Sequence, residues 1–144
     1  MIDIEARAKQ AMENFDNGYN CCQSVILAYS DITEVDHKTL ATLSAPFGGG
    51  MGRLREVCGA VSGMFMVTGF VFGDSDPKNS QAKKDNYQAV QTLAANFKDE
   101  NGSIICRELL GLTATPLPNK KKPCKELVGT AARMVGQLIN QKQL

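Results

Sequence analysis

Five cysteines are the residues of this 144-residue chain with the most distinctive chemistry. Cys21 and Cys22 are adjacent, whereas Cys58, Cys106 and Cys124 each stand alone. A thiolate attacks disulfides and binds metal ions, and the positive end of a helix dipole favours the thiolate over the thiol. Cysteines that lie at helix starts would therefore be suited to redox or metal chemistry.

Cys58 lies where a glycine-rich segment passes into the most apolar stretch of the chain. Residues 47–72 read FGGGMGRLREVCGAVSGMFMVTGFVF, and no residue from Val57 to Phe72 is charged. Small residues alternate there with bulky ones, which suits a helix that protein surrounds on all sides. We predict a buried central helix over residues 57–72, with Cys58 in its first turn and the Cys58 thiolate favoured by the helix dipole.

Cys21 and Cys22 also fall at a predicted helix start. Asn20 is a candidate N-cap, which places both cysteines in the first turn of the helix that follows. Adjacent residues on a helix point about 100° apart, so the two thiols face different ways. Only one of them is therefore expected to do chemistry.

The last two cysteines follow the same pattern. Ser103 is a candidate cap for the short segment SIICRELLG, in which Cys106 is the third helical residue. Pro123 suits the first turn of the last helix, and Cys124 begins the apolar stripe of that helix. Cys21, Cys58, Cys106 and Cys124 thus each fall in the first turn of a different predicted helix.

The remaining apolar periodicity also predicts helices. One spans residues 3–16, and another runs from Asp36 to Ser44 with Leu40 and Leu43 inward. A long helix ends near Glu100, with a buried stripe of Val90, Leu93, Ala94 and Phe97, and residues 113–123 are predicted to be a solvated loop. No segment alternates with a period of two. We predict an all-α fold over residues 1–144, a single-domain helical bundle of about six to seven helices around a buried central helix.

Composition excludes several classes of function. Sixteen basic and 15 acidic side chains give a formal charge of +1, so nothing favours binding of nucleic acid. The N-terminus does not resemble a secretory signal, and the central apolar run is slightly short for a membrane span. These features predict a cytoplasmic protein that is not inserted in a membrane. Its cysteines are expected to be reduced, metal-bound or catalytic, and the apolar content would allow a homodimer.

Four sequence blocks resemble one known family. GYNCCQSV, FGGGMGRLREVCGAVSG, SIICRELLG and the late Cys124 are similar, in order, to the pattern of the redox-active C_GCAxxG_C_C family. The family motif Cys-Gly-Ala-x-x-Gly matches residues 58–63, and Cys22 occupies none of the four cysteine positions of the pattern. The resemblance implies redox or metal chemistry at four thiols, those of Cys21, Cys58, Cys106 and Cys124.

Three hypotheses follow for these thiols. The first is thiol–disulfide electron transfer with an unknown redox partner. In it Cys58 is the attacking thiolate, Arg53 or Arg55 assists it, and Cys21 or Cys106 resolves the mixed disulfide. The second is a binding module that holds a metal ion or an iron–sulfur cluster through the same four cysteines. The third is a helical packing domain whose cysteines fill the core.

Other features are weaker. The chain lacks the CxxC pair of thioredoxin-like proteins, and the four cysteines lack the close pairs that are common at zinc sites. The loop GGGMGR lacks the Lys-Ser/Thr of a phosphate-binding P-loop. Its glycines are expected to allow a tight turn and a close approach of the backbone to the cysteine site, although exposed amides there could hold an anion. His37 is expected on the surface, and Met64 and Met66 are expected in the core.

Overall fold

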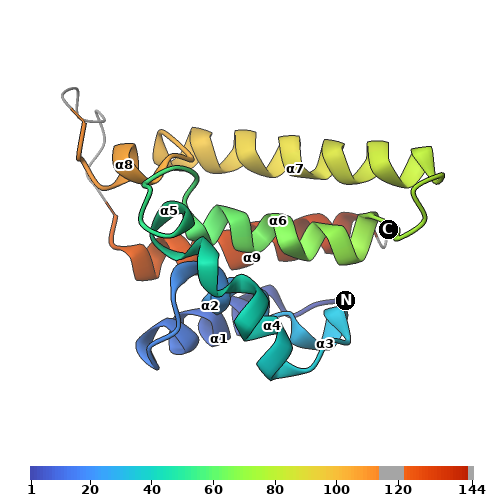
Figure 1. Cartoon of the computed structure of the whole chain (residues 1–144), viewed down its shortest axis with the longest axis horizontal. Helices are drawn as coiled ribbons and strands as arrows, with labels where there is room; N and C mark the ends of the chain where they lie inside the picture. Colours follow the sequence, from blue (N-terminus) through green and yellow to red (C-terminus); the bar gives the residue numbers. More distant parts are fainter. Residues whose placement is uncertain (114–121, 143–144) are drawn as a thin grey trace.

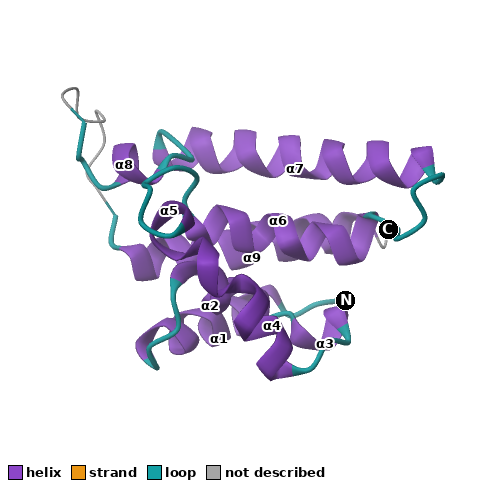
Figure 2. Ribbon diagram, viewed as in Figure 1, coloured by secondary structure: helices purple, strands orange, loops and turns teal. Residues whose placement is uncertain are grey.

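The computed structural model describes residues 1–113 and 122–142, and these residues form the helical fold of Figures 1 and 2. No β-strand occurs among them, so the predicted all-α, single-domain fold class is confirmed. An isolated antiparallel bridge joins Val57 to Ile105. The elements are α1 (Ile4–Asp16), α2 (Cys21–Leu27), α3 (Ser30–Thr33), α4 (His37–Ser44), the 3-10 turn η1 (Ala45–Phe47), α5 (Gly48–Met51), α6 (Gly59–Phe72), α7 (Ser80–Asn101), α8 (Cys106–Leu109) and α9 (Cys124–Lys142).

Side-chain caps fix several helix starts. Asn20 and Gln23 form a capping box on α2, in which each side chain accepts a hydrogen bond from the other residue's backbone amide. Asp36 caps α4, as predicted, and Asn79 caps α7 through the amide of Ala82. The helix starts, where the cysteines lie, are thus set by local hydrogen bonds.

The longer helices lie side by side. Figure 1 shows α6, α7 and α9 running lengthwise beside one another, with α1, α2 and α4 on the side away from α7. Helix α6 packs against α2, α7 and α9, and α1 packs against α9 and α2. None of the helices within the described residues is long and apolar enough to cross a membrane. The predicted loop over residues 113–123 falls largely on residues 114–121, outside the described part of the chain.

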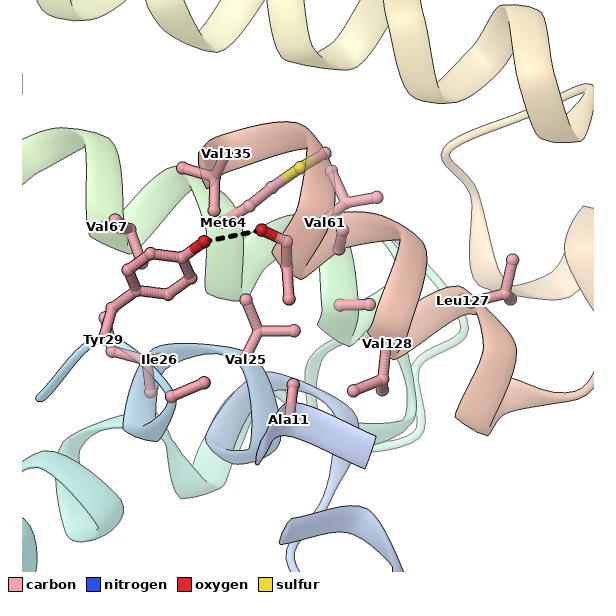
Figure 3. Packing of buried hydrophobic residues seen from close by; sticks show 14 of the residues in the cluster. Ala11, Val25, Ile26, Tyr29, Val61, Met64, Val67, Leu127, Val128 and Val135 are labelled. Carbon is pink, nitrogen blue, oxygen red and sulfur yellow. Dashed lines mark hydrogen bonds between the residues drawn. The ribbon is translucent and has the colours of Figure 1, made fainter. Parts of the chain in front are cut away.

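The core lies between α2, α6 and α9. Figure 3 shows Val25, Met64 and Val135 converging there from these three helices. Tyr29 crosses the same space, and its hydroxyl donates a hydrogen bond of 2.6 Å to the Ala132 carbonyl (Figure 3). Because the buried hydroxyl has this partner, Tyr29 adds apolar contact and also ties the start of α3 to α9.

Three packing predictions need correction. Helix α6 contains buried residues only as far as Thr68, and Gly69 and Phe70 beyond it are exposed. Leu43, predicted to point inward, is 55% exposed, whereas Leu40 of the same helix is fully buried. On α7 the buried stripe contains Leu93 and Phe97 as predicted, but its other buried members are Ala89 and Asn101. On α4 and α7 the helical period was right, and neighbouring helices set which residues of the predicted face are buried.

Two motif glycines let α6 approach α2 closely. A Cβ atom added at Gly59 would lie 3.1 Å from the Cys21 Cβ, and one added at Gly63 would lie 2.8 Å from the Val25 Cβ. The Gly63 Cβ would also lie 2.9 Å from the Cys22 carbonyl oxygen. These positions, four residues apart, face α2 on one side of α6, so backbone and side chains of the two helices meet where larger residues would force them apart.

We expect two Gly→Ala changes on α6 to have opposite effects on stability. Gly63→Ala should lower the free energy of unfolding by roughly 1 to 3 kcal/mol, because its Cβ overlaps α2. Gly69→Ala should raise it by roughly 0.5 to 1 kcal/mol, because its Cβ meets no atom within 4 Å and alanine favours a helix. Urea denaturation followed by circular dichroism measures both. Equal effects of the two changes would contradict the close α2–α6 contact.

Candidate functional site

Four cysteines begin four helices and line one cavity. Cys21, Cys106 and Cys124 are the first residues of α2, α8 and α9, and Cys58 is the N-cap residue of α6. All four line a small cavity that we call the thiol cavity. Figure 1 shows α5, α8 and the start of α9 at the same end of the molecule. Residues separated by up to 103 positions in the sequence thus meet at one place. This convergence could not be predicted from the positions of the helix starts alone.

The thiol cavity is small and largely apolar. Its volume is about 40 Å³, enough for one or a few water-sized groups. Cavities that hold whole organic ligands are roughly ten times larger. Besides the cysteines, its lining includes Leu109, Leu110 and Leu127. The prediction that Cys106 shares a face with Leu109 and Leu110 is therefore confirmed. Leu127 of α9 also lines the cavity.

The bridge between residues 57 and 105 positions Cys58 and Cys106. The Cys58 amide donates to the Ile104 carbonyl at 2.8 Å, and the Cys106 amide donates to the Glu56 carbonyl at 2.6 Å. In this antiparallel register the two cysteines are diagonal neighbours on one side of the bridge, with Cα atoms about 7 to 8 Å apart. Two helix starts, 48 residues apart, are therefore held by backbone hydrogen bonds that no periodic pattern in the sequence indicates.

The helix starts differ slightly from those predicted. Ser103 does not cap α8, which begins at Cys106 after Ile105. The Ser103 hydroxyl instead accepts a hydrogen bond from the Ile105 amide and donates one to the Glu108 carboxylate. Helix α6 begins two residues later than predicted, because Val57 takes part in the bridge. Both changes arise from the bridge, which extends the backbone just before each cysteine.

A glycine also lies directly against Cys106. A Cβ at Gly50 would lie 2.5 Å from the Cys106 Cβ and 2.9 Å from the Arg55 Cα. Any larger residue would displace the cysteine or the bridge. The prediction that the loop glycines bring the backbone close to the cysteine site is confirmed at Gly50. The sequence did not show which of these glycines makes the contact, and the family resemblance of the loop was the one further signal for it.

The glycine loop forms a left-handed turn. Residues 49–53, Gly-Gly-Met-Gly-Arg, have φ angles between 60° and 68°, and the Gly52 amide donates to the Gly48 carbonyl at 2.9 Å. The turn α5 therefore has the opposite hand from an ordinary α-helix. For Met51 and Arg53 this conformation costs roughly 1 to 2 kcal/mol each. Strain of this kind persists where surrounding contacts enforce it, and it is concentrated at functional sites.

Arg55 was predicted to assist Cys58, but it contacts Cys106 instead. Its Nη1 atom lies 3.7 Å from the Cys106 sulfur. In the described part of the chain, Cys106 is the one thiol among Cys21, Cys58 and Cys106 with a cation at hydrogen-bond distance. The cation that the sequence suggested for Cys58 therefore lies beside Cys106.

The pKa of Cys58 is raised, and the prediction that its position would favour the thiolate is wrong. Burial raises the pKa of the Cys58 thiol from its ordinary value of 9.0 to about 11. The amides of Ala60 and Val61 lower it, but neither forms a capping hydrogen bond and burial outweighs them. The side chain is only 6% exposed. Helix position favours a thiolate only where the sulfur keeps enough polar surroundings to carry the charge.

Cys21 and Cys124 form a hydrogen-bonded thiol pair. The hydrogen bond to Cys124 is the largest cause of a strongly raised pKa at Cys21, followed by burial and then by electrostatic interaction with the neighbouring cysteines Cys58, Cys124 and Cys106. This direction fits Cys21 as the proton donor and the Cys124 sulfur as the acceptor. Both residues are half-buried, whereas Cys58 and Cys106 are buried. The pair is thus the part of the thiol cavity that a reactant reaches first.

Cys22 lies outside the thiol cavity. It is fully buried, and its sulfur lies 3.5 Å from the Met66 sulfur in the core. Burial, and then the charge of Cys58, raises the pKa of Cys22 to about 12. Cys22 is therefore suited to packing and is protonated at neutral pH, in keeping with the prediction that only one of the two adjacent cysteines does chemistry.

The four cysteines are chemically suitable metal ligands, but their positions among the described residues do not form a metal site. Four thiolates are the ligands of structural zinc and of iron–sulfur clusters. Within residues 1–113 and 122–142, however, no group of three or more His, Cys, Asp or Glu side chains is placed so that it could hold a metal ion. His37 is exposed, as predicted, and its ring meets the edge of Tyr19. Zinc–sulfur bonds of about 2.3 Å would require the thiols to draw closer together.

Comparison with known proteins identifies one family. The family model described as "Putative redox-active protein (C_GCAxxG_C_C)" matches residues 19–138. The matched range contains all five cysteines and the glycine loop. No curated protein and no solved structure matches the chain. The chemistry of the thiol cavity therefore rests on its own geometry.

We expect Cys58→Ala to flatten the alkaline dependence of stability. Because the folded-state pKa of Cys58 lies above 9.0, the protonated thiol stabilises the fold fully below pH 9, and this contribution is lost as the pH rises through about 11. The difference in pKa corresponds to roughly 3 kcal/mol. Under reducing conditions, urea denaturation should show a smaller loss of unfolding free energy between pH 9 and 11 in the variant than in the wild type.

A matched control separates titration from packing. Ser62 is also buried on α6, and its side chain does not titrate in this range. Ser62→Ala should shift the unfolding free energy by a constant amount and leave its pH dependence unchanged. An alkaline slope that Cys58→Ala leaves intact would show that other groups cause it.

Proposed function

The chain belongs to the C_GCAxxG_C_C family, and we propose that it carries out thiol–disulfide exchange at the thiol cavity. The observation that carries the proposal is the convergence of Cys21, Cys58, Cys106 and Cys124 on one cavity of about 40 Å³. Four thiols around so small a space allow an incoming sulfur to meet one thiol while a second lies ready to displace it. Packing alone would not require four helix starts to present the same reactive group.

Cys124 is the proposed attacking thiolate and Cys21 the resolving thiol. Cys124 begins a helix of 19 residues, whose dipole favours negative charge at that end. The hydrogen bond from Cys21 supports the same charge. Cys58 is less suited to the role that the sequence suggested for it, because its sulfur is buried and its pKa is raised. Accessibility and charge therefore both favour the half-buried pair.

The proposed reaction balances in two steps. The Cys124 thiolate attacks one sulfur of a disulfide R–S–S–R, forms a Cys124–S–S–R mixed disulfide and releases the thiolate RS⁻, which takes up a proton from solvent to give the first thiol. The Cys21 thiol, on losing its proton, then attacks the Cys124 sulfur and releases the second thiol. Two cysteines are oxidised, the disulfide is reduced by two electrons, and the two protons leave with the two thiols. Cys58 and Cys106 supply a second dithiol beside the first.

We expect the reduced protein to consume an uncharged disulfide with a defined product. With bis(2-hydroxyethyl) disulfide in the absence of oxygen, a Cys21–Cys124 disulfide should form, two thiols should be lost per chain in that step, and dithiothreitol should restore them. Cys124→Ser should slow the reaction at least about 100-fold, because the other thiols are buried or protonated. Thiol titration and mass-spectrometric mapping measure the outcome.

Two further variants test the assigned roles. Cys21→Ser should trap the reagent on Cys124 as a stable adduct, since the resolving thiol is missing. Cys22→Ser is the matched control and should behave as the wild type, because Cys22 lies outside the thiol cavity. Formation of a disulfide by the Cys124→Ser variant at the wild-type rate would contradict the assignment.

The alternative that the four cysteines bind a metal is tested by a separate assay. Protein purified without oxygen is assayed for zinc and iron and for a visible absorption spectrum. About one metal ion or cluster per chain, lost in Cys58→Ser, would replace the exchange mechanism by a four-cysteine binding site. The present arrangement of the thiols does not favour that outcome.

A further inference from the structure

A second, larger pocket adjoins the thiol cavity. We call it the outer pocket, and its volume is about 380 Å³. This is within the usual size range of small-molecule sites. Its lining includes backbone of the glycine loop and two polar side chains, and consists of Asn20, Ala45, Gly48, Gly49, Gly52 and Arg53.

Two residues connect the outer pocket to the thiol cavity. Gly49 lines both spaces, so the two spaces are adjacent at this residue. Asn20 lines the outer pocket and directly precedes Cys21, which lines the thiol cavity. The Asn20 side chain is fixed, because its Nδ2 donates to the Ala45 carbonyl at 2.9 Å and its oxygen accepts from the Gln23 amide. A molecule in the outer pocket therefore lies next to the residue that precedes Cys21.

Arg53 gives the outer pocket a positive charge. It is exposed, and within the described residues it forms no ion pair. A Cβ at Gly49 would lie 2.8 Å from the Arg53 Cγ and 3.9 Å from the Arg55 Nη1, so both arginines lie over this wall. The nearby Glu56 pairs with Arg107 instead. An exposed guanidinium group that forms no ion pair within the described residues is suited to bind a carboxylate ligand.

The two spaces differ in size, so each can hold a different part of a ligand. The thiol cavity has room for little more than a reacting sulfur, and the outer pocket has room for the remainder of a small molecule. We propose that the outer pocket binds low-molecular-weight disulfides and thiols that carry a carboxylate, with the carboxylate at Arg53 and the sulfur toward the thiol cavity. This rests on the proposed function, because it names the substrate class of the same exchange reaction.

The test compares three disulfides that differ mainly in charge. They are 3,3′-dithiodipropionic acid, bis(2-hydroxyethyl) disulfide and cystamine, which are anionic, neutral and cationic at pH 7.5. Each rate of protein thiol loss is measured at low ionic strength and divided by the rate at which dithiothreitol reduces the same disulfide, which removes differences in intrinsic reactivity. The wild type should favour the anionic disulfide.

Variants at position 53 should change this preference. Arg53→Gln should slow the anionic disulfide about two- to fivefold and leave the neutral one unchanged, as expected for one partly exposed ion pair. Arg53→Glu should shift the preference toward cystamine, a gain that misfolding cannot produce. Lys84→Gln is the control, because it removes the same charge from an exposed site. Lys84 is near the start of α7, and that start lies at the opposite end of the molecule from α5 (Figure 1).

The outcomes separate this inference from the proposed function. Reaction with all three disulfides at ratios that the Arg53 variants leave unchanged would overturn the outer-pocket assignment and leave the exchange function standing. An equal effect of Lys84→Gln would also overturn it, because the preference would then come from net charge. Failure of the wild type to react with any of the three disulfides would overturn both.

Discussion

The site depends on the close contact of helices α6 and α2 at Gly59 and Gly63. Because neither glycine has a Cβ, the backbone of α6 reaches the first turn of α2, and the start of α6 is held beside Cys21. Gly50 plays the same part for Cys106 on the other side of the cavity. Glycines thus set the separation between the cysteine-bearing elements, which is why glycine and cysteine occur together in the motif of this chain.

The same close packing creates a conflict between position and reactivity. Helix starts favour thiolates, yet packing removes the water that would solvate them, and burial raises the pKa of Cys58 and Cys22. A site with four buried thiols would be inert if all were equivalent. The structure makes them unequal: Cys21 and Cys124 are half-buried and share a hydrogen bond, and Cys106 has Arg55. Unequal surroundings are what allow one thiol of a group to attack while another resolves.

The glycine loop connects the two spaces of the proposed site. Its left-handed turn brings Gly50 against Cys106 and leaves Arg53 over Gly49, so one short segment closes the thiol cavity and lines the outer pocket. Non-glycine residues in this conformation cost free energy, which the bridge between residues 57 and 105 helps to offset. The loop and the bridge form one unit, since the Glu56 amide donates to the Gly50 carbonyl and the Glu56 carbonyl accepts from Cys106.

The sequence by itself determined the helices and their starts, because caps, glycine stops and apolar periodicity act over a few residues. It placed Cys21, Cys58, Cys106 and Cys124 at four helix starts, each within two residues of its observed position. It could not determine which thiols are buried, which of them Arg55 contacts, or that Cys21 and Cys124 share a hydrogen bond. Those properties depend on contacts between residues up to 103 positions apart. Desolvation and charge at a thiol are sums over such neighbours, and only the packed chain brings the neighbours together.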